Sequence, residues 1–264
     1  MLSNLRQLFR YRALVETLVV RELKARYRGS VLGYFWSFVN PLLLLLVFSF
    51  VFTEIMPRGE EVDLEPYAVF MFCGLLPWTW FSSSLMDAAN ALIINGNLIK
   101  KVMFPAEILP VVSVISNMVH FLFGMPILIG FLIYNSVPLH PGELLWFPVV
   151  VAVQFILTLG LAMVLSALTV HFRDIKDLLA NLLTLWMFAS PIIYPMAFLS
   201  ERAKGFMDLN PFAHLAISYQ EIFFYDGPFG HWKWLLALAF AGSVLFLVGY
   251  WLFDRLRDSF AEEV

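Results

Sequence analysis

The sequence is poor in charged residues and in cysteine. Only 14% of its 264 residues are Asp, Glu, Lys or Arg, whereas 61% are apolar, and the mean hydropathy is +0.79. Soluble globular chains average about 25% charged and about 45–50% apolar residues, so this apolar surplus must face lipid rather than water. The single cysteine, Cys73, lies in an apolar run, which excludes an internal disulfide and a thiolate metal site. Such a chain is one membrane domain, without room for a soluble catalytic domain.

Motifs of the common catalytic and nucleotide-binding sites are also missing. No glycine is followed by lysine, which excludes the GxxxxGKS/T phosphate-binding loop, and HExxH, CxxC and GxSxG do not occur. The five histidines are scattered, so we predict no metal site. A net charge of −3 gives no indication of nucleic-acid binding. We therefore expect no catalytic residues, no cofactor bound by this chain and no nucleic-acid partner.

The sequence contains instead a series of long apolar runs. About 20 apolar residues cross a hydrocarbon core of roughly 30 Å. Runs that reach this length cover residues 34–53, 67–94, 108–134, 144–170, 178–199 and 232–253. We predict an all-α, polytopic membrane protein with a six-span transmembrane domain over residues 34–253. Pro191 and Pro195 each remove a backbone donor and should break the fifth span near one membrane face.

Three further segments flank or interrupt the spans. Residues 1–33 place apolar residues at helical spacing opposite a basic face, which favours an amphipathic helix in the membrane surface. A solvated, charged lead-in to the first span is the alternative. Residues 203–229, in which Asn210 and Pro211 form a helix start, predict re-entrant helices at the outer membrane face. Residues 254–264 form a charged tail.

The positively charged residues indicate an orientation. Of the 17 Lys and Arg residues, all but four lie before the first span, in the turns near residues 100 and 175, or after the last span. The four exceptions are Arg58, Arg202, Lys204 and Lys233. Because cytoplasmic segments carry the excess of positive charge, we expect both termini to be cytoplasmic and the number of spans to be even. We also find no removable signal peptide.

Polar and aromatic residues inside the spans give further candidates. Asp87 is the clear acidic residue near a span interior, and we predict a helix-packing or subunit-contact role for it rather than ion coupling. Aromatic residues make up 17% of the chain. An interfacial belt explains most of them, but some could line a channel along which sugar rings slide. The channel-lining candidates are Tyr34, Phe38, Trp186 and Tyr194.

A series of short motifs resembles one known family. The sequences RELK (21–24), RYRGS (26–30), LGYFW (32–36) and NPL (40–42) are similar to the entry motif of ABC-2 type polysaccharide export permeases, the exporters of O-antigen, teichoic acid and capsule. The likeness continues in order along nearly the whole chain. It runs through GLLPW (74–78), NLIKKV (97–102), FP (104–105), RD (173–174), SPIIYP (190–195) and NP (210–211).

The resemblance implies a homodimeric permease in the bacterial inner membrane, bound to two copies of a separate ATPase subunit that holds ATP and Mg²⁺. It also implies a lipid-linked polysaccharide substrate, carried on a polyprenyl diphosphate. Arg21, Lys24, Arg26 and Arg28 would lie at the substrate entrance, where they would attract the diphosphate. Anchoring the helix at the interface and setting the topology is the alternative role of these four residues.

The resemblance also assigns the short segment after the second span to coupling with the ATPase. Asn97, Lys100, Lys101, Val102 and Phe104 would dock on that partner, and an ordinary cytoplasmic turn is the alternative. Two other function classes stay open. One is an ABC-2 permease for another lipid or a drug, and the other is a membrane enzyme acting on glycolipids.

Overall fold

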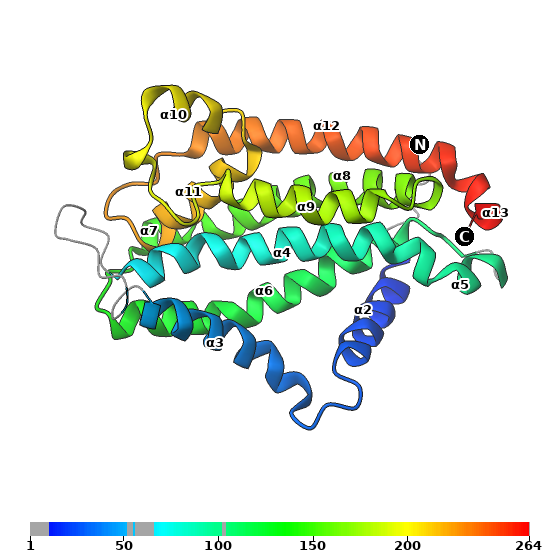
Figure 1. Ribbon diagram of the computed structural model, residues 1–264, viewed down its shortest axis with the longest axis horizontal. Helices are drawn as coiled ribbons and strands as arrows, with labels where there is room; N and C mark the ends of the chain where they lie inside the picture. The colour runs from blue at the N-terminus through cyan, green and yellow to red at the C-terminus, as the bar shows by residue number, and fades with distance from the viewer. Residues whose placement is uncertain (1–10, 52–54, 56–65, 102–103, 264) are drawn as a thin grey trace.

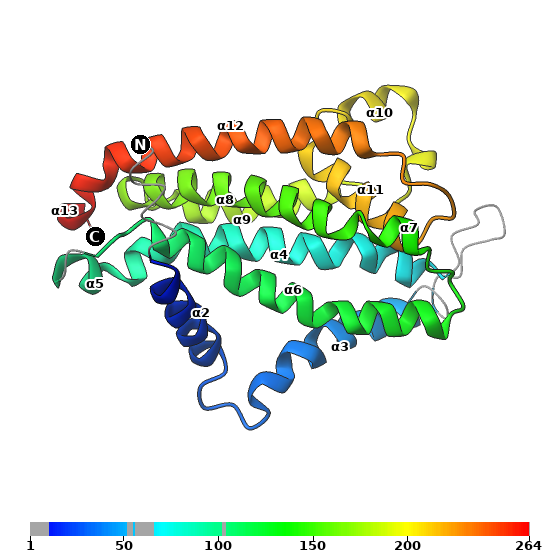
Figure 2. The same cartoon turned by 180° about the vertical axis from the view of Figure 1, so that it is seen from behind.

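The structure is a computed structural model that describes residues 11–51, 55, 66–101 and 104–263, and it is built from helices lying side by side (Figures 1 and 2). The longest are α4 (Tyr67–Ile94), α6 (Ile108–Tyr134), α8 (Phe147–His171) and α12 (Trp232–Leu256). In the part of the chain that is described, these four are long and apolar enough to cross a membrane. The short α7 (Pro141–Leu144) leads into α8. The prediction of an all-helical, polytopic membrane protein is confirmed.

Two predicted spans are represented by shorter helices. The first corresponds to α3 (Trp36–Phe50), an apolar helix of 15 residues, and the fifth to α9 (Ile175–Phe188), a helix of 14 residues. At 1.5 Å per residue, each covers only about 20 Å. α9 ends at Phe188, before Pro191, and a 3₁₀ turn, η3 (Met196–Phe198), follows it. The count of six spans therefore stays a prediction.

One end of the bundle gathers the short helices that we expect in the cytoplasm. α5 (Gly96–Lys101) and α13 (Phe260–Glu263) lie in contact at this end (Figure 1). α2 (Arg12–Arg26) begins near the same end and crosses the bundle at a steep angle before the chain turns back into α3. Leu18 and Val19 on α2 are buried against α6, and most charged side chains of α2 remain exposed. Residues 1–10 lie outside the described residues, and an amphipathic helix in the membrane surface over residues 1–33 stays a prediction.

The opposite end carries α10 (Glu201–Met207) and α11 (Pro211–Phe223). Asn210 caps α11, since its side-chain oxygen accepts hydrogen bonds from the backbone N–H groups of Phe212 and Ala213. This confirms the predicted helix start at Asn210 and Pro211. α11 packs against α4, α7, α8 and α12, so the segment forms part of the core rather than a loop over it.

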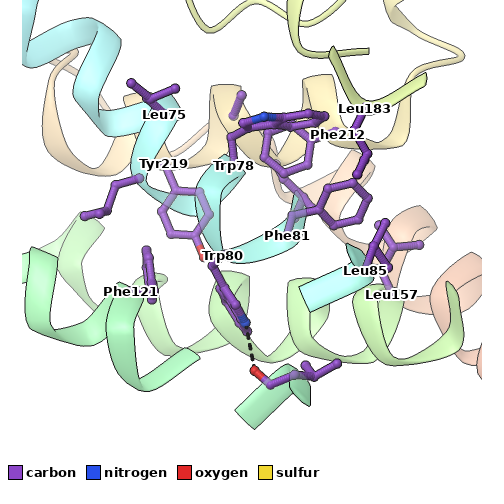
Figure 3. Close-up of a cluster of buried hydrophobic side chains, with 14 of the residues drawn as sticks. Leu75, Trp78, Trp80, Phe81, Leu85, Phe121, Leu157, Leu183, Phe212 and Tyr219 are labelled. Carbon is purple, nitrogen blue, oxygen red and sulfur yellow. Dashed lines mark hydrogen bonds between the residues drawn. The ribbon is translucent and has the colours of Figure 1, made fainter. Parts of the chain in front are cut away.

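Aromatic rings from several helices fill the centre of the molecule (Figure 3). Trp80 of α4 is buried, stacks on Phe121 of α6 and donates its indole N–H to the carbonyl oxygen of Val114 at 3.1 Å. Phe212 and Tyr219 of α11 are buried in the same cluster. These contacts hold α4 rigidly between α6 and α11 and thereby determine which face of α4 stays uncovered.

Candidate functional site

The uncovered face of α4 is polar. Between residues 67 and 92 of this helix, all but six residues are buried. The six exceptions are half-buried and are one, three or four residues apart in the sequence. These six are Thr79, Ser82, Ser83, Met86, Asp87 and Asn90, and five of them are polar. Residues three and four apart lie on one face of a helix. A face in contact with lipid would be apolar, because polar groups in hydrocarbon are costly. This polar stripe therefore faces water, a polar ligand or another polypeptide.

Two hollows lie along the polar stripe. The first, of about 450 Å³, is enclosed by α2, α3, α4 and α6 and is called here the α2–α3 hollow. The second, of about 520 Å³, lies between α4 and α9 and is called the α9 hollow; Thr184 of α9 adds a hydroxyl to it. Arg26 and Ser83 line both. Together the two hollows form a polar groove that follows the exposed face of α4.

Arg26 is held at the junction of the two hollows by a network of polar contacts. Its Nη2 lies 2.8 Å from Oδ2 of Asp87, and its Nη1 donates to Oδ1 of Asn117 at 3.2 Å. Asn117 donates in turn to the same Asp87 oxygen at 2.8 Å. The network joins α2, α4 and α6, which agrees with the helix-packing role predicted for Asp87. The side chains of Arg26 and Asp87 keep about a third of their surface exposed (35% and 36%), so both remain accessible from the groove.

A second polar network lines the deeper part of the α2–α3 hollow. Ser37 at the start of α3 donates to the hydroxyl oxygen of Tyr27 at 2.7 Å. Nδ1 of His120 on α6 lies 3.4 Å from that hydroxyl and 3.3 Å from the Ser37 hydroxyl. The end of α2 and the start of α3 are thus both hydrogen-bonded to the middle of α6.

The other basic residues predicted at the entrance lie on a different face of α2. Arg21, Lys24 and Arg28 are exposed and surround a separate hollow of about 570 Å³. Arg21 also donates to the side-chain oxygen of Asn95 at 3.2 Å. The structure therefore separates the four predicted residues into Arg26, which lies inside the polar groove, and three cations on the outer surface of the helix.

One carboxyl group of α2, that of Glu22, has a raised pKa. Burial, and next the nearby carboxylate of Asp87, raise the pKa of Glu22 above its ordinary value. Arg26 and Arg21 act in the opposite direction without reversing the shift. The carboxylate of Asp87 therefore affects the pKa of a carboxyl group on the neighbouring helix.

The predicted channel-lining aromatic residues have contacts of their own. The side chain of Tyr34 lies outside the described residues. Phe38 packs against Phe123 at 5.1 Å, Trp186 donates its indole N–H to Asn210 at 2.7 Å, and Tyr194 donates to the carbonyl oxygen of Phe188. None of Phe38, Trp186 and Tyr194 lines the two hollows of the groove. A role for them in a channel between two copies stays a prediction.

The predicted coupling residues are divided between exposed and packed positions. Asn97 and Lys100 of α5 are exposed. Phe104 is half-buried and packs against the Leu18, Val19, Ile108 and Val112 cluster at the contact of α2 and α6. Val102 and the side chain of Lys101 lie outside the described residues. Phe104 therefore serves the chain's own core, and Asn97 and Lys100 are the residues that a partner can reach.

Sequence analysis missed most of the groove. It singled out Asp87 and Arg26 but not Thr79, Ser82 or Ser83, although these recur at helical spacing in an otherwise apolar span. That spacing was the available signal. In the described part of the chain, no group of three His, Cys, Asp or Glu residues is placed to hold a metal ion.

The bundle of long apolar helices with a polar groove defines a membrane-embedded transport component, and the chain belongs to the ABC-2 type transporter family, whose model matches residues 13–224. The names of its relatives are more specific than the family description. It is 40% identical over 267 residues, covering the whole of both chains, to the O-antigen export system permease protein RfbA of Myxococcus xanthus. It is 33% identical to the protein of the same name from Klebsiella pneumoniae, over 94% of this chain and 95% of the relative.

A third relative is less similar. The polysialic acid transport protein KpsM of Escherichia coli is 26% identical over 76% of this chain and 77% of its own length. These findings confirm the resemblance drawn from the motifs. They also confirm that the chain is a permease subunit of a transporter and not an enzyme.

Proposed function

We propose that this chain is the membrane subunit of an ATP-driven exporter that carries a polyprenyl-diphosphate-linked polysaccharide across the bacterial inner membrane. It would act as a homodimer with two copies of a separate ATPase subunit, and both termini would be cytoplasmic. The observation that carries the proposal is the polar stripe of α4, which stays uncovered in a helix that is otherwise buried. The names of the relatives support a polysaccharide as the substrate.

The chemistry of the groove suits a sugar polymer. Hydroxyl groups of Thr79, Ser82, Ser83 and Thr184 line the groove. Those of Thr79, Ser82 and Thr184 donate to carbonyl oxygens of their own helices and can accept hydrogen bonds from a ligand, whereas that of Ser83 can both donate and accept. They therefore match sugar hydroxyls without binding one anion tightly, which a moving polymer requires. Lys24 on α2 and Arg28 in the turn after it are exposed and would attract the diphosphate from the cytoplasmic leaflet. Arg26, inside the groove, would receive it.

The energy for movement would come from the partner. ATP and Mg²⁺ would bind to the ATPase subunit, and its motion would reach this chain through α5, whose Asn97 and Lys100 are exposed. α5 follows α4 directly, so a displacement of α5 would be transmitted to the polar stripe. The short helices α3 and α9 flank the groove and would move relative to α4 to open it.

Cysteine labelling tests whether the polar stripe faces water. In a Cys73→Ala background, a charged thiol reagent should modify Ser82→Cys and Ser83→Cys, because thiols react as thiolates in water. Leu236→Cys is the control, since Leu236 is exposed on the apolar face of α12 and should face lipid. Lack of reaction at both stripe positions would contradict an aqueous groove.

The same reagent tests the orientation. Asp226→Cys, at an exposed position near the outer end, should react from outside intact spheroplasts. Asn97→Cys in α5 should react only after permeabilisation. Asp226 is preferred to Phe229, which is buried and stacked on Trp146.

A further inference from the structure

We propose that the α2–α3 hollow is a binding site for the sugar ring that adjoins the diphosphate of the lipid-linked substrate. The phosphate would contact Arg26 at the mouth of the hollow, and the ring would enter between α3 and α6. This inference rests on the proposed function, because it assumes a lipid-linked glycan. It goes further by assigning recognition of the first sugar to a site within a single copy of the chain.

The composition of the hollow carries the inference. Nine of its 14 lining residues are polar or charged. Seven of the nine lie on α2, α3, α4 and α6, and Tyr27 and Ser30 lie in the turn after α2. Polar groups at such positions are expensive and are retained for function. The hollow has about 450 Å³, which falls in the range of roughly 300–1,000 Å³ that small-ligand sites occupy. Its size and polarity therefore fit a small, highly hydroxylated ligand.

The types of side chain favour a sugar over a bare anion. Ser83 and Asn40 offer both donors and acceptors, as the hydroxyl groups of a pyranose require. The Thr79 hydroxyl donates to the carbonyl oxygen of Leu76 at 2.7 Å and offers an acceptor. Trp36 lines the same hollow and provides an aromatic face for the apolar side of the ring. An anion site would gather cations, but Arg26 is the one residue among the 14 lining side chains that carries a permanent positive charge.

The position of Arg26 connects the sugar site to the diphosphate. A guanidinium has five N–H donors. The bonds to Asp87 and Asn117 engage Nη2 and Nη1, which leaves further donors for phosphate oxygens. Because Arg26 also lines the α9 hollow, a substrate bound here would have its diphosphate at the junction of the groove. The sugar next to the diphosphate would then lie in the α2–α3 hollow.

Binding of two matched lipids tests the proposal. The purified protein in nanodiscs would be titrated with a polyprenyl diphosphate and with the same lipid carrying one pyranose, and tryptophan fluorescence would report binding. The glycosylated lipid should bind about three- to tenfold more tightly, since each net hydrogen bond contributes about one such factor. Asn40→Leu should abolish this difference and leave the affinity for the bare diphosphate unchanged.

The control is Asn90→Leu, which alters the polar stripe outside the α2–α3 hollow and should preserve the difference. Asn40 is exposed, so its substitution spares the core, and an unchanged melting temperature would establish that the variant is folded. Equal affinity of wild type for both lipids would overturn the sugar site while leaving the proposed function intact. Failure of both lipids to bind, or equal binding of a phospholipid such as phosphatidylglycerol, would count against diphosphate capture itself.

Discussion

Arg26 joins α2 to α4 and α6, so substitutions there change helix packing as well as charge. Its neighbours Lys24 and Arg28 are exposed and can be altered without that side effect. We predict that Lys24→Glu combined with Arg28→Glu reduces the stimulation of ATPase activity by lipid-linked substrate, because the diphosphate would meet repulsion. Basal ATPase activity and the melting temperature should not change. Unaltered stimulation of ATPase activity would show that Lys24 and Arg28 do not belong to the substrate entrance.

Arg26→Glu should behave differently, because it places a carboxylate beside Asp87. Because the ion pair is partly exposed, its loss should lower the free energy of unfolding by about 1 kcal/mol or less. Repulsion between the two carboxylates and loss of the hydrogen bond to Asn117 should lower it further. Combining Arg26→Glu with Asp87→Arg should recover stability, since the charges are exchanged, but not substrate stimulation. Melting temperatures of the single and double variants measure this, and equal stability of all variants would exclude the packing role.

His214 and His231 form a hydrogen-bonded pair at the end of the bundle that carries α10 and α11. Nδ1 of His214 lies 3.0 Å from Nε2 of His231, and Nε2 of His214 lies 3.0 Å from the carbonyl oxygen of Asp208. Glu221 accepts backbone N–H bonds from Gly230 and His231 and lies 3.4 Å from Nδ1 of His231. The two imidazole rings and the Glu221 carboxyl group thus form one hydrogen-bonded cluster.

This cluster predicts a loss of stability in acid. Burial lowers the pKa of His214, and burial of Glu221 is outweighed by hydrogen bonds from His231 and Gly230, which lower its pKa. A lowered pKa contributes stability above the unfolded-state value, and this is lost as the pH falls through the folded-state value. Melting temperatures should therefore decline below the ordinary values, 6.5 for His214 and then 4.5 for Glu221. His214→Gln should reduce the decline in melting temperature below pH 6.5. A wild-type melting temperature that is constant from pH 7.5 to 5 would contradict the predicted role of His214.

At the scale of elements, hydrophobic patterning predicted the long helices well. The expected spans 67–94 and 108–134 match α4 and α6, because each is a long apolar run bounded by turn residues. The fifth span was predicted over 178–199, yet α9 ends at Phe188. The prolines that follow were recognised as breakers, but the helix also stops short of the first of them. The face of α4 that stays uncovered could not be predicted, since it depends on where α6, α8 and α11 pack.

The contact between α8 and α12 depends on glycine. A Cβ atom added at Gly160 would lie 2.8 Å from the backbone nitrogen of Phe246, and one at Gly249 would lie 2.6 Å from the carbonyl oxygen of Gly160. Small residues allow membrane helices to approach this closely. Gly160→Ala should therefore push the two helices apart and lower the free energy of unfolding by about 1–3 kcal/mol. Gly130→Ala, with no atom within 4 Å of its Cβ, is the matched control and should be neutral by thermal unfolding. Equal melting temperatures would refute the close contact.

A substitution at an exposed residue of α5 tests coupling to the ATPase subunit without disturbing the packing of this chain. Truncation of Phe104 would disturb that packing. Asn97→Trp adds bulk at an exposed position and should block docking, so that the ATPase subunit no longer copurifies. Asn135→Trp, exposed at the far end of α6, is the control and should copurify normally. Normal export by the Asn97→Trp variant would indicate that the ATPase subunit docks on another segment of the chain.

At the scale of the whole molecule, polar and apolar surfaces are segregated. Leu236, Phe240 and Trp251 on α12 are exposed and apolar, as lipid contact requires, and Leu182 and Leu185 extend this surface on α9. The polar groove lies along α4, and α2, which carries exposed cations, begins near one end of the bundle. This arrangement allows a charged lipid headgroup to approach from one membrane leaflet while its glycan enters a polar path. Sequence analysis predicted the segregation of charge along the chain but not the path, because the path is a tertiary feature.

The location of glycan in cells that lack this chain tests the central claim most directly. Export by this permease predicts that deletion abolishes one surface polysaccharide and that the same glycan, still linked to its polyprenyl diphosphate, accumulates on the cytoplasmic face of the inner membrane. Plasmid-borne wild type should restore the surface glycan. Normal surface polysaccharide with no intracellular lipid-linked glycan would contradict the account, and loss of the glycan without accumulation would indicate a biosynthetic role instead.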